Sequence, residues 1–365
     1  MKKIILGILV LVLSLSANET NNTSNQPTKN EQIGKFIEQL EANKKKYIGI
    51  FGKFTTDNIE PETWEKECKN GSSESCKNLA IYYNDIKLDT LKGFEYYRLS
   101  CNNGDGRACV FLGMLKIQNG LELDKKLAFE DFKKACDNNY ALGCSLVGDS
   151  YMTGTGIKQD SKKAVEYYKL ACKKGDFGGC ESIGKLYING IGVRQDTQKG
   201  LEYLEMSCSG KYYGACVDIG FAYMNGLNDL KSDYKKSYDY FDKACKGGFG
   251  GGCFNLGATY RDGIGVKQDI QKALKYFGLA CDSGLAQGCA IIGSFYHMGG
   301  YGIEKDYKKA FDNYQKACDL MDGAACYMLS AMFARGESVA ENFVKALEYL
   351  DKACDLGFED ASCHK

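Results

Sequence analysis

The stretch that decides the fold is CSLVGDSYMTGTGIKQDSKKAVEYYKLAC, residues 144–172, and a second copy, CESIGKLYINGIGVRQDTQKGLEYLEMSC, covers residues 180–208. In the first copy, Cys144, Val147, Gly148 and Tyr151 are spaced i, i+3, i+4 and i+7. This spacing predicts one buried face of an α-helix, here called helix A. A glycine on that face costs roughly 1 kcal/mol, so its recurrence predicts that a neighbouring helix packs closely against it.

A second helix, called helix B, follows a Gly-x-Gly turn. Asp160 is placed to cap the start of helix B in the first copy, and Asp196 and Asp269 stand at the same place in later copies. The apolar stripe of helix B consists of Ala164, Tyr167, Tyr168 and Ala171. A Cys-x-x-Gly sequence ends the helix, where glycine can take the left-handed C′ conformation.

The helix A–helix B unit recurs along the chain with its cysteines. Nine cysteine pairs are present, and successive pairs begin 33 to 37 residues apart. A period of this length is typical of helix–turn–helix solenoids. We therefore predict an all-α fold, an α/α solenoid of eight helix pairs, with a half-repeat around residues 64–70. The first, fifth and last copies depart most from the pattern, since Ala80 and Ser330 replace the helix A glycine in the first and the last.

Two cysteine pairings respect the repeat. One joins the two ends of a hairpin, such as Cys144 with Cys172, but its separations vary and it leaves Cys68 and Cys363 unpaired. The other joins each C-x7-C pair (one residue longer in the last) and leaves no cysteine over. Because a disulfide has narrow geometric tolerance, constant spacing favours the second pairing: Cys68–Cys76, Cys101–Cys109, Cys136–Cys144, Cys172–Cys180, Cys208–Cys216, Cys245–Cys253, Cys281–Cys289, Cys318–Cys326 and Cys354–Cys363.

The N-terminal residues predict export. Lys2 and Lys3 precede an apolar run over residues 4–13, and small residues follow, which is the pattern of a secretory signal peptide over residues 1–17. An uncleaved anchor is the alternative, although the run is short for one. Residues 18–60 read as a polar linker with an amphipathic cap helix over 33–54, and residues 61–365 as the repeats. Eighteen cysteines fit an oxidising compartment, periplasmic or extracellular.

Composition excludes several classes of function. Lys+Arg and Asp+Glu both number 47, so no basic surface for nucleic acid is expected. The chain has only two histidines and no C-x-x-C motif, which argues against a metal site. We predict no metal, no cofactor, no membrane-spanning segment after signal removal, and a monomer.

The Cys-x-x-Leu/Ile-Gly-x-x-Tyr-x-x-Gly-x-Gly half, followed by Lys-Ala-x-x-Tyr-Tyr-x-x-Ala-Cys, resembles the Sel-like repeat (SLR), a longer relative of the tetratricopeptide unit. Copies with this cysteine spacing in an exported chain resemble the Helicobacter cysteine-rich protein family. The resemblance covers residues 62–363. It implies a right-handed superhelix with a concave groove, and partners on the host or in the cell envelope.

Some members of that family carry β-lactamase or penicillin-binding labels, so a β-lactam or peptidoglycan-like ligand is an alternative expectation. Serine β-lactamases use Ser-x-x-Lys with Ser-Asp-Asn and Lys-Thr-Gly elements. Ser-x-x-Lys occurs at Ser182–Lys185 and at Ser232–Lys235, without either supporting element. Ser182 and Lys185 are therefore weak catalytic candidates, and no constellation for chemistry is visible.

A binding role is the preferred hypothesis, with a peptide, protein or glycan as partner. Residues one, two, five, eight and nine after each helix A cysteine are expected off the buried stripe, where tetratricopeptide-like arrays line their concave face. Position one includes Lys77, Val110 and Ser145 as well as residues named below. His297 is expected to be a solvated surface side chain, with ligand contact as the alternative. The candidate ligand-binding residues are Asp149, Glu181, Lys185, Phe221, Phe254, Arg261, His297 and Tyr327.

Overall fold

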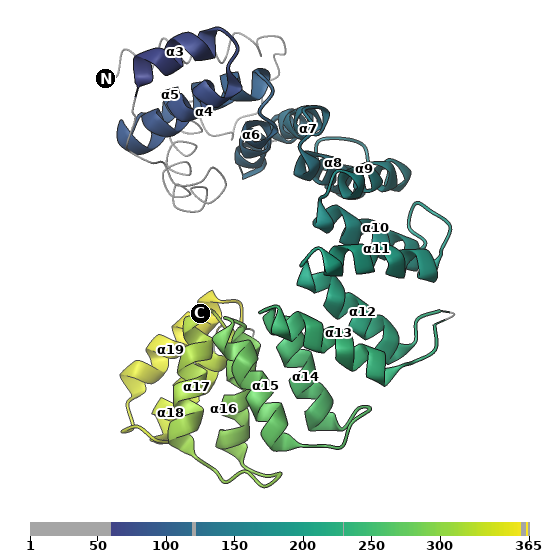
Figure 1. Ribbon diagram of the computed structural model, residues 1–365. Helices are drawn as coiled ribbons and strands as arrows, with labels where there is room; N and C mark the ends of the chain where they lie inside the picture. The colour runs from purple at the N-terminus through teal and green to yellow at the C-terminus, as the bar shows by residue number, and fades with distance from the viewer. Residues whose placement is uncertain (1–59, 119–121, 229, 359–362, 364–365) are drawn as a thin grey trace, which may run out of the picture.

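A computed structural model describes residues 60–118, 122–228, 230–358 and 363. The predicted signal peptide, residues 1–17, and the predicted cap helix, residues 33–54, lie outside the described residues, as does all but the last residue of the 18–60 linker. The described chain is an open arc of helix pairs whose two ends lie on the same side of the molecule (Figure 1). None of its helices combines the length and the apolar character needed to cross a membrane.

The eight predicted hairpins are present, and the all-α solenoid is confirmed. A half-repeat, α3, precedes them. The helices A are α4 (Ser73–Ile81), α6 (Gly106–Gln118), α8 (Ala141–Thr153), α10 (Phe177–Asn189), α12 (Tyr213–Asn225), α14 (Gly250–Asp262), α16 (Ala286–Met298) and α18 (Gly323–Arg335). The helices B are α3 (Pro61–Lys69), α5 (Thr90–Asn102), α7 (Glu122–Asp137), α9 (Ser161–Lys173), α11 (Thr197–Ser209), α13 (Tyr234–Lys246), α15 (Ile270–Asp282), α17 (Tyr307–Asp319) and α19 (Phe343–Asp355).

The ends of the helices follow from the residues that the sequence places there. The Asp160 carboxylate accepts hydrogen bonds from the backbone N–H groups of Lys162 and Lys163, both at 3.1 Å, which satisfies two donors at the start of α9. Gly154 ends α8 with φ of 78°. Such a left-handed backbone strains any residue with a side chain, so the turn requires glycine.

In five hairpins, the helix A glycine lets an aromatic ring of helix B lie against the backbone, and in a sixth Gly184 admits the side chain of Leu204. A Cβ built on Gly148 would come within 2.7 Å of the Tyr168 ring. The same relation joins Gly257 to Phe277, and Gly293 to Tyr314. The close approach, rather than any turn, explains why glycine stands in these helix interiors.

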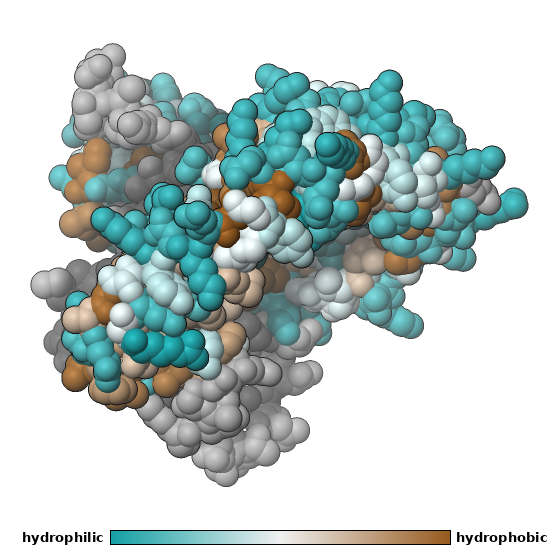
Figure 2. Space-filling view, turned by 90° about the horizontal axis from the view of Figure 1, so that it is seen from below, coloured by the Kyte–Doolittle hydropathy of each residue, from teal (hydrophilic) through white to brown (hydrophobic). Residues whose placement is uncertain are grey.

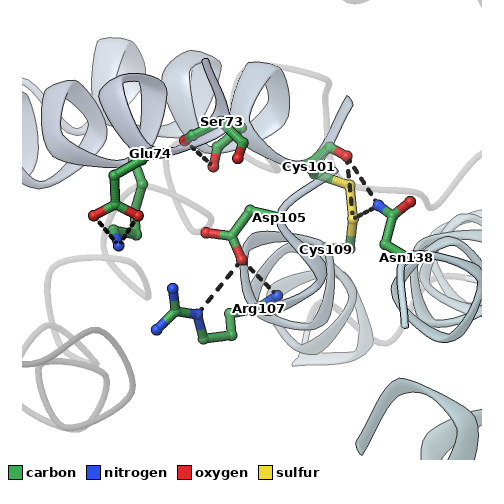
Figure 3. A network of polar contacts seen from close by, with 9 residues as sticks. Ser73, Glu74, Cys101, Asp105, Arg107, Cys109 and Asn138 are labelled. Atoms are coloured by element: carbon green, nitrogen blue, oxygen red, sulfur yellow. Dashed lines mark hydrogen bonds and ion pairs between the residues drawn. A yellow bond between two sulfur atoms is a disulfide. The ribbon is translucent and has the colours of Figure 1, made fainter. Parts of the chain in front are cut away.

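Each hairpin is clamped to the next by a disulfide. All nine C-x7-C or C-x8-C pairs are bonded, and their Cα atoms lie 4.5–4.9 Å apart in eight junctions and 5.5 Å apart in Cys354–Cys363. Polar contacts surround the bridge: Asn138 Nδ2, from the following junction, donates to the Cys101 carbonyl at 3.4 Å and lies 3.8 Å from the Cys109 sulfur (Figure 3). Ser100 Oγ donates to the Ser73 carbonyl at 2.8 Å and so ties α5 to α4.

A second recurring contact holds helix A to helix B. In six hairpins two aromatic rings stack with centroids 5.4–6.0 Å apart, as Tyr187 and Tyr203 do at 5.7 Å. A lysine near the start of helix B lies over the helix A ring, as Lys199 does over Tyr187 at 4.8 Å. In the second hairpin the same two positions hold Lys116 and Asp131, which form an ion pair instead.

Contacts between repeats show which layer lines the inside of the arc. Consecutive helices A touch one another, α6 with α8, α8 with α10 and α12 with α14, whereas no two consecutive helices B of the described chain make as extensive a contact. In a curved array the more closely spaced layer lies on the inside of the curve. The helices A therefore form the inner face.

The three irregular copies differ in ways that their sequences explain. The first lacks the Gly-x-Gly turn and ends its helix A in a short π-helix, Tyr82–Ile86. In the fifth, the side chain of Asn228 donates to Thr197 Oγ1 of the preceding hairpin at 2.9 Å. In the last, Ser330 replaces the packed glycine, and its hydroxyl donates to the Ala346 carbonyl at 2.7 Å.

We predict opposite effects for two glycine-to-alanine substitutions. Gly148→Ala forces a methyl group against the Tyr168 ring and is expected to lower the free energy of unfolding by about 1–3 kcal/mol. Gly278→Ala, within α15 and with nothing within 4 Å of its Cβ, is expected to raise it by up to about 1 kcal/mol. Chemical denaturation of both variants measures this, and equal destabilisation would contradict the packing account.

Candidate functional site on the inner face

The inner face carries one linked group of charged side chains across α10 and α12. Lys185 Nζ lies 3.0 Å from Glu181 Oε1, one turn earlier on α10, and 2.9 Å from Asp218 Oδ2 on α12. The side chains of Glu181, Asp218 and Lys185 are 16%, 30% and 47% exposed, so one cation serves two partly buried carboxylates. Two of the candidates, Glu181 and Lys185, are thus in contact. Both also contact Asp218, which the sequence analysis did not single out.

Burial and charge set the protonation of this group. Desolvation raises the pKa of Glu181, and contact with the Asp218 carboxyl raises it further, while Lys185 opposes both. For Lys185, desolvation lowers the pKa, but its contacts with Asp218 and Glu181 outweigh that effect and the pKa is raised. Lys185 is therefore held as an ammonium.

Two further polar pairs extend this group of charged side chains toward α8. Tyr168 Oη donates to Asp149 Oδ1 at 2.6 Å, and burial followed by this bond raises the pKa of the Tyr168 phenol. Ser145 Oγ on α8 donates to Asp176, which caps α10 by accepting from the N–H of Gly179. Asp149, Asp176, Glu181 and Asp218 supply four carboxylates against the single ammonium of Lys185. This group is acidic.

The aromatic candidates differ in exposure. Phe221, on α12, remains 38% exposed and packs edge-on against Phe241 with centroids 5.3 Å apart. Phe254 packs against Phe277 at 5.3 Å, and Tyr327 stacks on Phe358 at 4.7 Å. Phe254 and Tyr327 are thus half-buried packing residues, and Phe221 is the most exposed of the three aromatic candidates.

Two predictions about exposure were wrong. His297 is not a solvated side chain: it is 13% exposed, its Nε2 lies 2.7 Å from Glu337 Oε2, and Tyr307 packs edge-on against its ring at 5.4 Å. Position one after the helix A cysteine was expected off the buried stripe, but Lys77, Val110 and Ser145 are 7%, 1% and 7% exposed. These positions face the contact between consecutive helices A, a second buried side that a single-stripe analysis does not include.

Arg261 forms an ion pair with Asp262, the next residue in the chain. Its Nε lies 2.7 Å from Asp262 Oδ1 and its Nη2 lies 2.7 Å from Asp262 Oδ2, so the two side chains form a bidentate ion pair. The arginine is half-buried and turned to this partner. It lies one hairpin beyond the α10–α12 charged group.

The Ser-x-x-Lys matches lack the geometry for nucleophilic catalysis. Ser182 is one turn before Lys185 on α10, but a lysine acting as base needs a lowered pKa, and Lys185 has a raised one. Ser232 and Lys235 are both exposed, in the turn before α13 and within that helix. All eighteen cysteines are bonded, so no thiolate is available.

Metal ligands do not gather in the described part of the chain. Across residues 60–118, 122–228, 230–358 and 363, no group of three or more His, Cys, Asp or Glu side chains has the arrangement to hold an ion. The residues that sequence reasoning missed are Asp176, Tyr168 and Asp218. Tyr168 was recognised only as part of the apolar stripe of helix B, and Asp176 was not singled out. Nothing in one sequence shows that Asp218 reaches Lys185 on the neighbouring helix.

Comparisons with known proteins give the following likenesses. The family model described as "Sel1 repeat" matches eight segments: residues 73–105, 106–140, 141–176, 179–212, 214–249, 251–285, 286–320 and 323–358. No curated protein matches the sequence. A protective antigen of uropathogenic Escherichia coli with an SLR fold is 24% identical, with a TM-score of 0.59 over 84% of this chain and 66% of that one, so the chain spans just under two thirds of its length.

Two further structures are similar. A Sel1 repeat protein from Oxalobacter formigenes is 18% identical, with a TM-score of 0.57 over 97% of each chain. Cysteine rich protein B of Helicobacter pylori is 29% identical over 37% of this chain and 97% of its own, with a TM-score of 0.30. The first two likenesses establish the fold.

We predict a pH-dependent cost for Lys185→Met. Removing the ammonium leaves the Glu181 carboxyl beside Asp218 with no opposing cation, so the pKa of Glu181 rises further above its ordinary value. A carboxyl with a raised folded pKa stabilises the fold only in its protonated form, and that stability is lost as pH rises. Thermal unfolding is expected to show a lowered Tm at pH 8 and little change at pH 4. Lys162→Met, at an exposed position on α9, is the control, and a pH-independent loss in Lys185→Met would contradict the coupling.

We predict that purified oxidised protein does not hydrolyse nitrocefin. Wild type, Ser182→Ala and Ser232→Ala are expected to match the buffer blank, because Lys185 is held as an ammonium and the sequence lacks the Ser-Asp-Asn and Lys-Thr-Gly elements. Turnover that either substitution abolishes, or covalent penicillin labelling of one serine, would establish the enzyme alternative instead.

Proposed function

The chain belongs to the Sel1 repeat family, whose scaffolds generally mediate protein–protein interaction, and we propose that it binds an extended segment of a partner protein along its inner face. The observation that carries this proposal is the division of each helix A into two sides. The side toward helix B repeats the same small and apolar residues, whereas the inner side changes from repeat to repeat. Variable side chains on a fixed frame are what a binding surface requires.

The properties of the inner face indicate the chemistry of the partner. From α8 to α12 the surface offers Asp149, Glu181 and Asp218, with Lys185 neutralising one charge. Phe221 follows on the same helix as Asp218. A partner segment with a basic side chain next to an apolar one matches this order, because the basic group meets carboxylates and the apolar group meets an exposed aromatic ring.

The disulfides support a site of action outside the cytoplasm. Nine bridges with no free cysteine suit an oxidising compartment. We propose that the chain is exported by its N-terminal signal, residues 1–17, and acts in the periplasm or outside the cell. Envelope proteins or host proteins are then the available partners, with a glycan segment as the alternative ligand of the same surface.

Photo-cross-linking from the inner face tests this function. A benzoylphenylalanine at position 221 is expected to form a covalent adduct with a protein of the envelope or host-cell extract. The matched control carries the same residue at position 170, on helix B, because Leu170 and Phe221 are both 38% exposed. Adducts from neither position, or equally from both, would contradict an inner-face site.

A further inference from the structure

The last helix of the array leaves an apolar patch on its outward side. Phe343, Val344 and Leu347 of α19 are 63%, 69% and 61% exposed. They lie within five residues on the N-terminal half of the helix, so they form one patch. A patch of this kind, on the order of 400 Å², is the size that often marks an interaction site on a single-chain protein.

Leu347 occupies a position that is buried in three of the earlier helices B and half-buried in four others, α5, α13, α15 and α17. The buried residues at this position are Phe129 in α7, Val165 in α9 and Leu201 in α11. Those three are 5%, 4% and 7% exposed, and each of their helices packs against the helix A that follows. The outward side of α19 thus continues the repeat-to-repeat interface, and the surface that complements it is a helix.

Val344 is apolar at a position where the six preceding helices B have polar residues. The residues at its place in the six preceding helices B are all polar: Lys126, Lys162, Gln198, Lys235, Gln271 and Lys308. The packing of those six hairpins therefore does not use an apolar side chain at this position.

The charges around the patch are negative. Glu341, Glu348 and Asp355 are exposed. The two lysines of α19 turn back toward the array: Lys345 Nζ lies 5.3 Å from the centre of the Phe333 ring, and Lys352 Nζ lies 3.6 Å from Asp319. The outward side therefore combines apolar side chains with carboxylates.

A second copy of the chain does not complement this side. Two α19 faces would bring their carboxylates together. The opposite end of the described array, α3, presents polar residues such as Glu62, Thr63 and Lys66. A tail-to-tail contact therefore opposes like charges, and a head-to-tail contact through α3 places the patch against polar residues.

We propose that the outward side of α19 is a docking site for a basic amphipathic helix of a partner protein. The apolar stripe of that helix would pack on the patch as a following helix A packs on the earlier helices B, and its lysines or arginines would meet Glu341, Glu348 and Asp355. This site is separate from the inner face, so a partner can occupy both or either. Because the patch is small, the expected dissociation constant is on the order of 10–100 µM.

The test uses a defined probe and the full mature chain. An 18-residue peptide of leucine and lysine, with leucines spaced i, i+3, i+4 and i+7, is titrated by calorimetry. Binding is expected to weaken at least tenfold in the double variant Val344→Ser, Leu347→Ser. The matched control is Leu88→Ser at the other end of the array, since Leu88 and Val344 are both 69% exposed. Both substitutions lie at exposed positions, and an unchanged Tm verifies that the variants fold.

Two control peptides separate apolar docking from charge attraction. A scrambled peptide of the same composition keeps the charge but loses the stripe, and a leucine–glutamate peptide keeps the stripe but reverses the charge. Both are expected to bind at least tenfold more weakly. The proposal is overturned if the leucine–lysine peptide does not bind, if the scrambled peptide binds equally, or if the double variant binds as wild type does.

Discussion

The rest of the structure depends on the short covalent link at each junction. Eight of the bridges join residues eight apart, and the ninth joins residues nine apart. A solenoid has few contacts beyond nearest neighbours, so its stability is close to a sum of local terms. Closing a small loop at every junction constrains the unfolded chain by roughly 2–3 kcal/mol per bridge in the loop-entropy account. The bridges also fix the position of each helix A against the preceding helix B, and so the course of the inner face.

Periodicity predicted most of the fold because each local rule recurs in several of the eight repeats. The i, i+3, i+4, i+7 stripe, the Asp160-type caps and the Gly-x-Gly turns are all local rules, and each could be checked against its neighbours in the sequence. Position one after the cysteine was misjudged because a helix A has two buried sides. The second side meets the helix A of another repeat, and its burial at Val110 depends on curvature that no single repeat encodes.

The candidate site was predictable in its location and less so in its composition. Helical spacing placed Lys185 and Phe221, both five residues after a helix A cysteine, on the inner face. Contacts between repeats were not visible: Asp218 reaches Lys185 from the next helix A, and Glu337 reaches His297 across forty residues of sequence. Such pairs depend on the distance between neighbouring hairpins, which is set by packing of the glycine and aromatic residues and not by the residues that meet.

The bridges span the junctions between hairpins, never the turn inside one. A protease that cuts within a junction loop therefore leaves the two fragments joined by sulfur, and the cut chain can keep its shape. A cut in a Gly-x-Gly turn, at Gly154 and Gly156 for example, leaves two pieces with no covalent connection. The glycine turns are thus places where one cleavage divides the molecule.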